Sequence, residues 1–246
     1  MFVQDINPIL LNIFGLNIRY YGLVYVFGFL LLLFVLSREK SRLKLSQEDV
    51  YDYILFSIIF IIVGARIFEI LFYNPSFYFS NPLEMLKIWK GGLSFHGGLL
   101  GMIILTHIFT KKKKLHFYDI SDKIVLPVAF VLFLGRIANF INGELVGKIT
   151  DVPWAVKFRN YEGFRHPTQI YEAIKNLLIF FVLLPLKNKK MKKGTLTWLF
   201  ILLYGALRFF IEFFKEQSSF ILGIPVAQIF CFIMIVVSLT FLLKKK

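Results

Sequence analysis

Runs of about 20 mostly apolar residues recur from one end of the chain to the other, and they constrain its fold more than any other feature. A helix needs about 20 such residues to cross a bilayer, where its backbone must satisfy its own hydrogen bonds. The chain is 57% hydrophobic, against roughly 45–50% in soluble domains. We therefore expect an all-α integral membrane protein, with residues 1–246 as one polytopic membrane domain. The predicted transmembrane helices, seven in all, are 18–36, 51–73, 93–110, 120–141, 168–186, 195–214 and 225–243.

The net charge of +14 is concentrated in short basic clusters between the apolar runs. These clusters lie within residues 38–44, 111–114, 187–193 and 244–246. They follow the first, third, fifth and seventh predicted spans, so all of them fall on one side of the membrane. Because Lys and Arg are enriched in cytoplasmic loops, the N-terminus is predicted outside and the C-terminus in the cytoplasm. Charge beside spans is typical of membrane anchors, so it does not indicate a nucleic-acid partner.

Two connections on the outer side are longer than a turn. Residues 74–92 contain two Asn-Pro pairs and Trp89, and they predict an interfacial helix. Residues 142–167 are polar and contain several Gly and Pro, and they predict a small extracytoplasmic lobe. The chain shows no internal repeat, which argues against an inverted-repeat transporter. Its one cysteine, Cys231, excludes an internal disulfide and a thiolate metal site.

Ionisable side chains inside a span are costly, on the order of 3 kcal/mol for Arg, so each is a candidate site residue. In the second span, Arg66 and Glu69 are three residues apart on one helix face. A pair at this spacing is often structural, and Glu69 can equally balance an arginine of another helix. Both residues are secondary candidates for the site. His96, Gly97 and Gly98 lie in a glycine-rich segment that lets helices or a ligand approach closely. A lone histidine is usually a packing residue, but imidazole at this depth is a candidate proton acceptor.

The fourth span ends in a cluster of polar residues. Arg136, Asn139 and Gly143 lie at i, i+3 and i+7 on one helical stripe. Asn142 and Glu144 follow beside them. A guanidinium with neighbouring amides suits bidentate recognition of a phosphate or a carboxylate. The alternative is an arginine that only extends to the outer interface, because the span ends nearby.

The fifth and sixth spans carry the other intramembrane candidates. Gln169 and Glu172 share a helix face, and helix capping does not explain why Glu172 enters the bilayer. Tyr204, Arg208 and Glu212 are each four residues apart and form one stripe. The arginines of the fourth and sixth spans both lie towards outer helix ends. They would repel each other unless an anion or a carboxylate lies between them, and a lipid phosphate is such an anion.

Five sequence blocks follow one another in a characteristic order. The most specific is Gly135-Arg136 with Asn139-Phe140-Ile141-Asn142-Gly143-Glu144 and Gly147. The others are Tyr20-Tyr21-Gly22, Ser94-Phe95-His96-Gly97-Gly98, His166-Pro167-Thr168-Gln169-Ile170-Tyr171-Glu172, and Tyr204-Gly205 with Arg208 and Glu212. Each block alone is a weak signal. Together they are similar to the prolipoprotein diacylglyceryl transferase family, over roughly residues 18–228.

The resemblance implies a seven-span enzyme of the bacterial inner membrane. Members of this family move the diacylglyceryl group of phosphatidylglycerol to the thiol of the lipobox cysteine in a preprolipoprotein signal peptide, and they release glycerol phosphate. The family's essential positions fall on Tyr21, His96, Arg136, Asn139, Glu144, Gly147, Tyr204, Arg208 and Glu212. The spacing of His, Asp and Glu offers no set of metal ligands, so we expect no metal and no organic cofactor.

The chemistry of this transfer assigns roles to the matched residues. A thiol with a pKa of about 8.5 must become a thiolate before it attacks the glyceryl carbon. We expect His96 to accept that proton, unless the positive potential of the arginines alone lowers the thiol pKa enough. We expect Arg136 and Arg208 to stabilise the charge on the departing phosphate.

The remaining matched side chains are expected to support this pair of arginines. Tyr21, Asn139 and Tyr204 are candidate hydrogen-bond donors to the phosphate. Glu144 and Glu212 are candidate partners that orient the guanidiniums.

The chain departs from the family pattern in four places. Ala138 stands where Gly usually precedes the asparagine. Lys215 replaces the usual Arg and keeps the charge, but it loses the bidentate geometry. Residues 223–227 before Gln228 differ from the usual Met/Ser/Gly-containing stretch, and the outer lobe is short.

Two other functional classes fit a membrane protein with intramembrane charges. A transporter or channel would move its substrate across the bilayer without consuming lipid. A non-catalytic scaffold would tolerate the loss of both His96 and Arg136.

Overall fold

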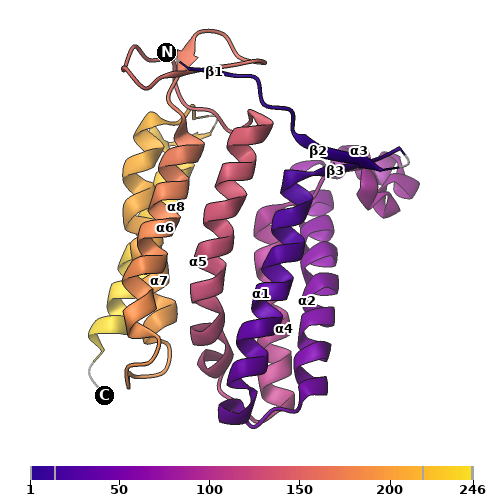
Figure 1. The fold of residues 1–246 in the computed structure, drawn as a ribbon, viewed down its shortest axis with the longest axis vertical. Helices are drawn as coiled ribbons and strands as arrows, with labels where there is room; N and C mark the ends of the chain where they lie inside the picture. Colours follow the sequence, from indigo (N-terminus) through magenta and orange to yellow (C-terminus); the bar gives the residue numbers. More distant parts are fainter. Residues whose placement is uncertain (1, 14, 218, 245–246) are drawn as a thin grey trace. The chain divides into compact units, whose positions relative to one another are not determined.

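The computed structural model describes residues 2–13, 15–217 and 219–244, and long helices make up most of this part of the chain (Figure 1). The long helices are α1 Tyr20–Leu43, α2 Gln47–Phe68, α4 Phe95–Lys112, α5 Phe117–Asn142, α6 Thr168–Leu183, α7 Thr195–Ile211 and α8 Val226–Leu243. Each predicted span coincides with one of them, so the predicted helical class is confirmed. Short helical turns continue three of them: a π-helical turn Glu69–Tyr73, and 3-10 turns Leu184–Leu186 and Glu212–Phe214.

Within the described residues, six helical segments are long and apolar enough to cross a membrane. They are Tyr20–Leu43, Gln47–Tyr73, Phe117–Asn142, Thr168–Leu186, Thr195–Phe214 and Val226–Leu243. The chain is therefore a multi-pass membrane protein. α4 is outside this set because two histidines and two terminal lysines lower the apolar character of its 18 residues. The third predicted span is helical, and its passage through the membrane stays a prediction.

The chain folds as two compact units. Unit 1 consists of Met1–Leu31 together with Asp122–Lys246, and unit 2 consists of Leu32–Ser121. α1 contributes its first half to unit 1 and its second half to unit 2. The prediction of one membrane domain over the whole chain stays a prediction.

In unit 2, α2 and α4 lie side by side with their backbones in direct contact (Figure 1). Gly64 of α2 and Gly97 of α4 face each other, and Gly101 lies against the backbone of Phe60. A Cβ on Gly64 would lie 2.5 Å from the carbonyl oxygen of Gly97, which is closer than a real Cβ approaches an oxygen. In lipid, small residues allow this packing, since apolar contact alone gives no driving force. The glycine-rich segment thus joins two helices.

Polar side chains fix the helix ends of unit 2. The Ser46 hydroxyl accepts a hydrogen bond from the Asp49 amide, and the Asp49 carboxylate accepts one from the Ser46 amide, both at 3.0 Å. This reciprocal capping box starts α2. The Ser94 hydroxyl accepts from the Gly97 amide at 3.4 Å and starts α4 in the same way. Lys113, after α4, forms an ion pair with Asp49, so the end of α4 lies beside the start of α2.

The connection over residues 74–92 forms three short turns instead of one interfacial helix. They are α3 Pro75–Ser80 and the 3-10 turns Pro82–Leu86 and Ile88–Lys90. Asn-Pro pairs interrupt the segment, because proline cannot donate the backbone hydrogen bond that a longer helix needs. Glu84 pairs with Lys87 at 2.6 Å and Lys90 at 2.9 Å, and these hydrogen bonds hold the pKa of its carboxyl below the usual range. Trp89 is exposed.

In unit 1, α7 packs against both α6 and α8. The apolar core that α5, α6 and α7 share is made of Val125, Ala129, Ile179, Leu183, Leu196 and Tyr204. Asp122 of α5 caps α7 by accepting hydrogen bonds from the Gly194 amide at 2.7 Å and the Thr197 amide at 2.9 Å. This cap replaces a local one, since Gly194 has no side chain to accept from the free amides of the first turn.

Short strands connect the helices. In unit 1, β1 Phe2–Gln4 pairs in parallel with β4 Val156–Phe158, which pairs antiparallel with β5 Phe164–Arg165. The two hairpins are β2 Ile9–Ile13 with β3 Leu16–Arg19, and β6 Phe220–Ile221 with β7 Ile224–Pro225. The sequence did not predict these strands, because two to five residues are too few to show an alternating pattern. The three-stranded sheet includes part of the predicted lobe over 142–167.

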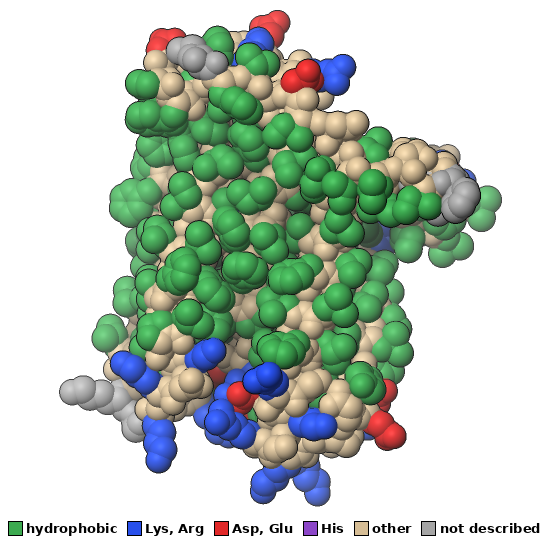
Figure 2. Space-filling view, viewed as in Figure 1, with side chains coloured by type: hydrophobic (Ala, Val, Ile, Leu, Met, Phe, Trp, Pro, Cys, Tyr) green, Lys and Arg blue, Asp and Glu red, His purple; other side chains and the backbone are tan. Residues whose placement is uncertain are grey.

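Apolar side chains cover the middle of the helices, and Lys and Arg gather at helix ends (Figure 2). In unit 1, the Lys192 ammonium donates to the Lys244 carbonyl oxygen at 3.2 Å, so two predicted basic clusters meet at one end. In unit 2, the Lys113–Asp49 pair brings the basic end of α4 to the turn after α1. Within each unit these contacts bring basic clusters to one end, and Lys245 and Lys246 of the last cluster lie outside the described residues. The location of all the clusters on one side of the membrane stays a prediction.

We expect Gly101→Ala to lower the thermal stability of the purified protein in detergent by about 1–3 kcal/mol. The added Cβ would overlap the Phe60 backbone and force α2 and α4 apart. Gly135→Ala is the matched control, because nothing lies within 4 Å of a Cβ at this helical position. There, alanine is expected to stabilise the helix by about 0.5–1 kcal/mol. Equal thermal midpoints for the two variants would contradict the close packing of α2 and α4.

Candidate active site

Glu172 lies at the centre of a group of charged side chains in unit 1. Its side chain is 0% exposed. One carboxylate oxygen lies 2.5 Å from the ammonium of Lys175, and the other lies 2.8 Å from that of Lys215. The Arg136 Nε lies 3.8 Å from the first oxygen. A buried carboxylate is stable only when such partners replace its hydration, and Glu172 has three of them.

On α7, Tyr204, Arg208 and Glu212 form the predicted stripe. Arg208 donates from Nε to Glu212 at 2.8 Å and from Nη1 to the Tyr204 hydroxyl at 3.2 Å. The Lys215 ammonium lies 3.4 Å from the Glu212 carboxylate. The Lys175 ammonium lies 3.6 Å from the centre of the Tyr204 ring, a cation–π contact. The two lysines therefore join the α7 stripe to the buried carboxylate of α6.

The last turn of α5 orients a second polar stripe. Gly143 ends the helix with φ +67°, a left-handed conformation that glycine adopts without strain. The chain then turns back, and the Asn139 amide donates to Glu144 at 2.7 Å, while Asn142 donates to it at 3.3 Å. Arg136 in turn donates to the Asn139 side-chain oxygen at 3.4 Å. The structure thus brings the predicted polar residues of this helix end together.

The start of α6 is tied to this turn. The Gln169 side chain donates to the Glu144 carbonyl oxygen at 2.6 Å, and the Thr168 hydroxyl donates to the Leu145 carbonyl oxygen at 3.0 Å. Both side chains are buried. These bonds fix α6 against the end of α5, and so they set the distance between Arg136 and Glu172.

Positive charge exceeds negative charge in this buried group. Four cations surround two carboxylates, which leaves an excess of two positive charges. The cations are Arg136, Lys175, Arg208 and Lys215, and the carboxylates are those of Glu172 and Glu212. The two arginine side chains are only 18% and 28% exposed. Glu144 is exposed and reaches Arg136 only through Asn139. A largely buried excess of positive charge favours a bound anion.

Gly147 lies where three segments meet. Its amide donates to the His166 carbonyl oxygen at 3.0 Å, and its own carbonyl oxygen accepts from Arg165 at 3.1 Å. A Cβ there would lie 2.6 Å from the Phe214 carbonyl oxygen and 2.7 Å from a Thr168 carbon. Close packing therefore requires glycine at this position.

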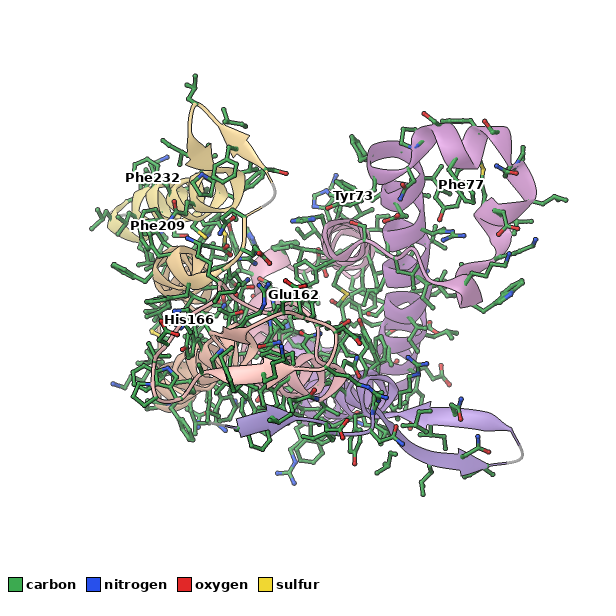
Figure 3. All side chains as sticks on the ribbon, turned by 90° about the horizontal axis from the view of Figure 1, so that it is seen from above. Tyr73, Phe77, Glu162, His166, Phe209 and Phe232 are labelled. Carbon is green, nitrogen blue, oxygen red and sulfur yellow. The ribbon has the colours of Figure 1, made fainter. Side chains whose placement is uncertain are left out.

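His166 precedes α6 and borders this junction (Figure 3). Its Nδ1 lies 3.1 Å from the Tyr171 hydroxyl, which accepts a hydrogen bond from the Trp154 indole at 2.7 Å. Burial, with a smaller effect of the positive charge of Lys148, lowers the pKa of His166 below its ordinary value. Both effects favour the neutral imidazole, whose unprotonated ring nitrogen can accept a hydrogen bond from the Tyr171 hydroxyl.

Tyr21 lies in the first turn of α1. Its hydroxyl lies 3.5 Å from that of Tyr25, and the two rings meet edge to face with centroids 5.3 Å apart. The neighbouring Tyr20 lines an apolar cavity of about 250 Å³ with Ile137 and Ala138 of α5. The start of α1 thus lies beside the end of α5, but the hydrogen bond of Tyr21 is with Tyr25 and not with an arginine.

His96 lies in the first turn of α4, in unit 2. Its side chain is exposed, and its Nδ1 lies 3.1 Å from the hydroxyl of Tyr73. Tyr73 is the last residue of the π-helical turn (Figure 3). The ring also lies near Phe68 and Phe95. The predicted arginines belong to unit 1, so the combination of His96 with them in one site stays a prediction.

Arg66 is buried and fixes the connection over residues 74–92. Its Nε donates to the Met85 carbonyl oxygen at 2.9 Å, and its Nη1 donates to that of Gly91 at 2.7 Å. The Glu69 carboxylate instead accepts from Asn74 at 2.7 Å. The predicted Arg66–Glu69 pair is therefore wrong, because carbonyl groups of the connection satisfy the guanidinium.

Several candidate glycines have structural explanations. Gly97 and Gly98 face α2, Gly143 ends α5, and Gly147 allows three segments to meet. In the described part of the chain, His, Cys, Asp and Glu side chains nowhere gather in groups of three that could hold a metal ion.

The sequence patterns did not predict Lys175, and they named Glu172 as an intramembrane candidate without a role in the transfer. Lys175 is 2% exposed and lies three residues after Glu172, so its spacing was the available signal. Arg165 falls in the predicted polar lobe, yet it is buried and donates hydrogen bonds to the Gly147 carbonyl oxygen and the Glu216 carboxylate. The side-chain oxygen and nitrogen of buried Asn176 both lack a hydrogen-bond partner among the described residues.

A family profile decides where this chain belongs. The profile described as prolipoprotein diacylglyceryl transferase matches residues 8–244. The chain is a member of this family.

Individual proteins of this family are similar in sequence to this chain over most of their length. The phosphatidylglycerol–prolipoprotein diacylglyceryl transferase of Geobacter sulfurreducens is 43% identical, over 87% of this chain and 84% of the relative. The protein of the same name from Rickettsia rickettsii (strain Sheila Smith) is 44% identical over 90% of each chain. That of Bordetella parapertussis is 40% identical, over 88% of this chain and 85% of the relative. The resemblance to prolipoprotein diacylglyceryl transferases is therefore confirmed.

In this member of the transferase family, we expect Glu172→Gln to destabilise the protein by about 3–5 kcal/mol, because Lys175 would remain buried without its counter-charge. Glu172→Gln with Lys175→Met is expected to recover most of that stability, since neither buried charge remains. Thermal unfolding in detergent measures both variants, with Glu48→Gln, at an exposed carboxylate, as the control. A double variant no more stable than Glu172→Gln would show that the two residues are not coupled.

Proposed function

We propose that this chain transfers the diacylglyceryl group of phosphatidylglycerol to the thiol of the lipobox cysteine of a preprolipoprotein and releases glycerol phosphate. Its membership of the transferase family supports this reaction class. The observation that carries the proposal is the excess of two positive charges around the buried carboxylates Glu172 and Glu212. A phospholipid that enters this region from the bilayer brings the missing negative charge.

The charge balance favours the transition state over the bound lipid. The phosphodiester of phosphatidylglycerol carries one negative charge. As the bond between the glyceryl carbon and the phosphate oxygen breaks, the electron pair stays on that oxygen, and the phosphate gains a second negative charge. A site with an excess of two positive charges therefore binds the leaving group more strongly than the substrate, which is how a binding site lowers a barrier.

Arg136 and Arg208 are our candidates for contact with the phosphate. Each guanidinium has five N–H donors, and the bonds to Asn139, Tyr204 and Glu212 occupy only some of them. The Tyr204 hydroxyl accepts from Arg208 and so keeps its own proton for donation. Glu212 orients Arg208 directly, whereas the predicted role of Glu144 towards Arg136 passes through Asn139.

We propose that His96 accepts the proton of the substrate thiol. The thiolate sulfur attacks the glyceryl carbon, a carbon–sulfur bond forms, and the carbon–oxygen bond to phosphate breaks. Near neutral pH only a few per cent of a thiol with a pKa of about 8.5 is ionised, so a base raises the rate. His96 is exposed and carries an imidazole, which supports this role. We expect Tyr21 to contribute a hydrogen bond to the substrate.

We further propose seven spans in the bacterial inner membrane, with α4 as the third. Its packing against α2 along a glycine seam supports an intramembrane position. With seven spans, every basic cluster lies in the cytoplasm, and the N-terminus and residues 142–167 lie outside.

Accessibility of single cysteines tests this topology. In a Cys231→Ala background, we expect a membrane-impermeant maleimide on intact cells to label Asn81→Cys and Asp151→Cys but not Lys112→Cys. The three sites are exposed in the folded chain. Labelling of both Asn81→Cys and Lys112→Cys would mean that α4 does not cross the membrane.

The transfer itself is tested with purified protein, phosphatidylglycerol and a lipobox peptide. Mass spectrometry is expected to show a gain of one diacylglyceryl group on the peptide cysteine. Arg136→Ala and Arg208→Ala are each expected to reduce the rate by at least about 10²-fold, because a preorganised partner of the developing charge is lost. Arg159→Ala is the control, since this arginine side chain is 82% exposed. No mass gain with the wild-type protein would disprove the function, and full activity of Arg136→Ala would remove its phosphate role.

The same assay tests His96. His96→Gln is expected to retain a rate that rises with pH up to about 8.5, because transfer would then depend on ionisation of the free thiol. His107→Gln is the matched control, as it changes another exposed histidine of α4. An unchanged pH dependence in His96→Gln would exclude the histidine as the base.

A further inference from the structure

Tyr73 is the hydrogen-bonding neighbour of His96, and the transfer proposed above gives it no role. Both residues belong to unit 2. The Tyr73 hydroxyl lies 3.1 Å from Nδ1 of His96. The other neighbours of the imidazole are the rings of Phe68 and Phe95, with centroids 6.1 Å and 6.0 Å away. Among the described residues, Tyr73 therefore supplies the polar contact of the imidazole ring.

A π-helical turn brings Tyr73 to this position. α2 widens at its end into the turn Glu69–Tyr73, and the Asn74 amide donates to the Glu69 carbonyl oxygen, five residues back, at 3.1 Å. A wider turn changes the direction of the side chains that follow, and such turns are frequent at functional sites. The turn thus places the tyrosine beside the first turn of α4, where His96 lies.

Backbone contacts fix His96 relative to this turn. The Ser94 amide, two residues before the histidine, donates to the Ala65 carbonyl oxygen of α2 at 3.1 Å. Gly97, one residue after it, packs against the backbone of α2. The start of α4 is therefore held against α2 on both sides of His96. The contact with Tyr73 follows from the packing of two helices and does not depend on two freely moving side chains.

We propose that Tyr73 positions His96 for proton transfer by accepting a hydrogen bond from its Nδ1–H. A neutral imidazole carries one ring proton, and the partner of one nitrogen decides which nitrogen is left unprotonated. With the proton on Nδ1, the lone pair of Nε2 can take the proton of the substrate thiol, and the electron pair of the S–H bond stays on sulfur. This inference rests on the proposed function, in which His96 is the base.

The contact becomes stronger as the proton is transferred. The imidazolium carries a proton on both nitrogens, so Nδ1–H then donates a charge-assisted hydrogen bond to the tyrosine oxygen. The free amides of the first turn of α4 carry partial positive charge and oppose the imidazolium. The oxygen of Tyr73 offsets part of this repulsion. An interaction that strengthens on the way to the transition state raises kcat without tightening the binding of the substrates.

A direct contact between Tyr73 and a substrate is the competing role, because the residue is 53% exposed. The geometry favours His96, since the hydroxyl already lies within hydrogen-bond distance of its ring. The two roles differ in a measurable way. A positioning residue acts only while His96 is present, whereas a substrate contact acts with or without it.

The protonation site of His96 tests the contact without requiring transfer. Nitrogen NMR of the purified full-length protein with isotope-labelled histidine distinguishes the two ring nitrogens, and the His96 signals are those that His96→Gln lacks. In the neutral ring of the wild type, we expect the proton on Nδ1. Tyr73→Phe keeps the aromatic ring and is expected to lose this preference. Tyr51→Phe is the matched control, because it removes an exposed hydroxyl of α2 at the other end of the helix.

A double-mutant cycle in the transfer assay measures the functional consequence. Tyr73→Phe is expected to lower kcat about tenfold, the loss of about one hydrogen bond, and to leave the KM of both substrates unchanged. In the His96→Gln background, Tyr73→Phe is expected to have no further effect, because the residue through which it acts is absent. Tyr51→Phe is expected to keep full activity.

Contrary results would overturn the positioning role. A proton on Nε2 in the wild type, or His96 signals that Tyr73→Phe leaves unchanged, excludes it. A loss of kcat that is equally large in the His96→Gln background, or a rise in KM alone, would assign the tyrosine to a substrate. If Tyr73 determines the protonation site but the wild type adds no mass to the peptide, the proposed transfer fails while the contact between Tyr73 and His96 stands.

Discussion

The ion pairs of Glu172 hold the functional end of unit 1 together. Its carboxylate has no exposure to solvent, and Lys175 and Lys215 replace its hydration, one at each carboxylate oxygen. Through Lys215 and the ring contact of Lys175 with Tyr204, α6 is coupled to the stripe of α7. Arg136 and Arg208 therefore lie beside carboxylates that the lysines already neutralise. Their capacity for an external anion follows from that arrangement.

Close backbone packing is the second constraint, and it acts in both units. Gly64, Gly97 and Gly101 let α2 and α4 touch, and Gly147 admits the carbonyl of Phe214 and the side chain of Thr168. In lipid, helices do not associate by removing apolar surface from water. Their association depends on close van der Waals packing, which small residues allow. Glycines beside catalytic candidates thus belong to the scaffold that positions them.

Patterns along single helices were predictable, and contacts between helices were not. Tyr204, Arg208 and Glu212 could be placed on one stripe, because helical geometry fixes which residues share a face. The same reasoning suggested an Arg66–Glu69 pair, but the arginine reaches the carbonyl oxygens of Met85 and Gly91 in a connection whose path no periodicity describes. The spacing of Glu172 and Lys175 along α6 was visible in the sequence, but the contact of Lys175 with the Tyr204 ring joins two helices and was not. The resemblance to the transferase family supplied the roles that local patterns could not.

The sequence by itself determined that this is a membrane protein, that it is helical, and which helix carries each charged side chain. The length of an apolar run and the spacing of residues on a helix can both be seen within one segment of the chain. It also determined the family, because the order of the five sequence blocks can be recognised without knowing which residues are in contact. Only the tertiary structure decided which carboxylate faces which cation and why Gly147 must be glycine. Those facts depend on distances between residues that are far apart in the sequence. The packing of the helices sets these distances, and they cannot be derived from composition.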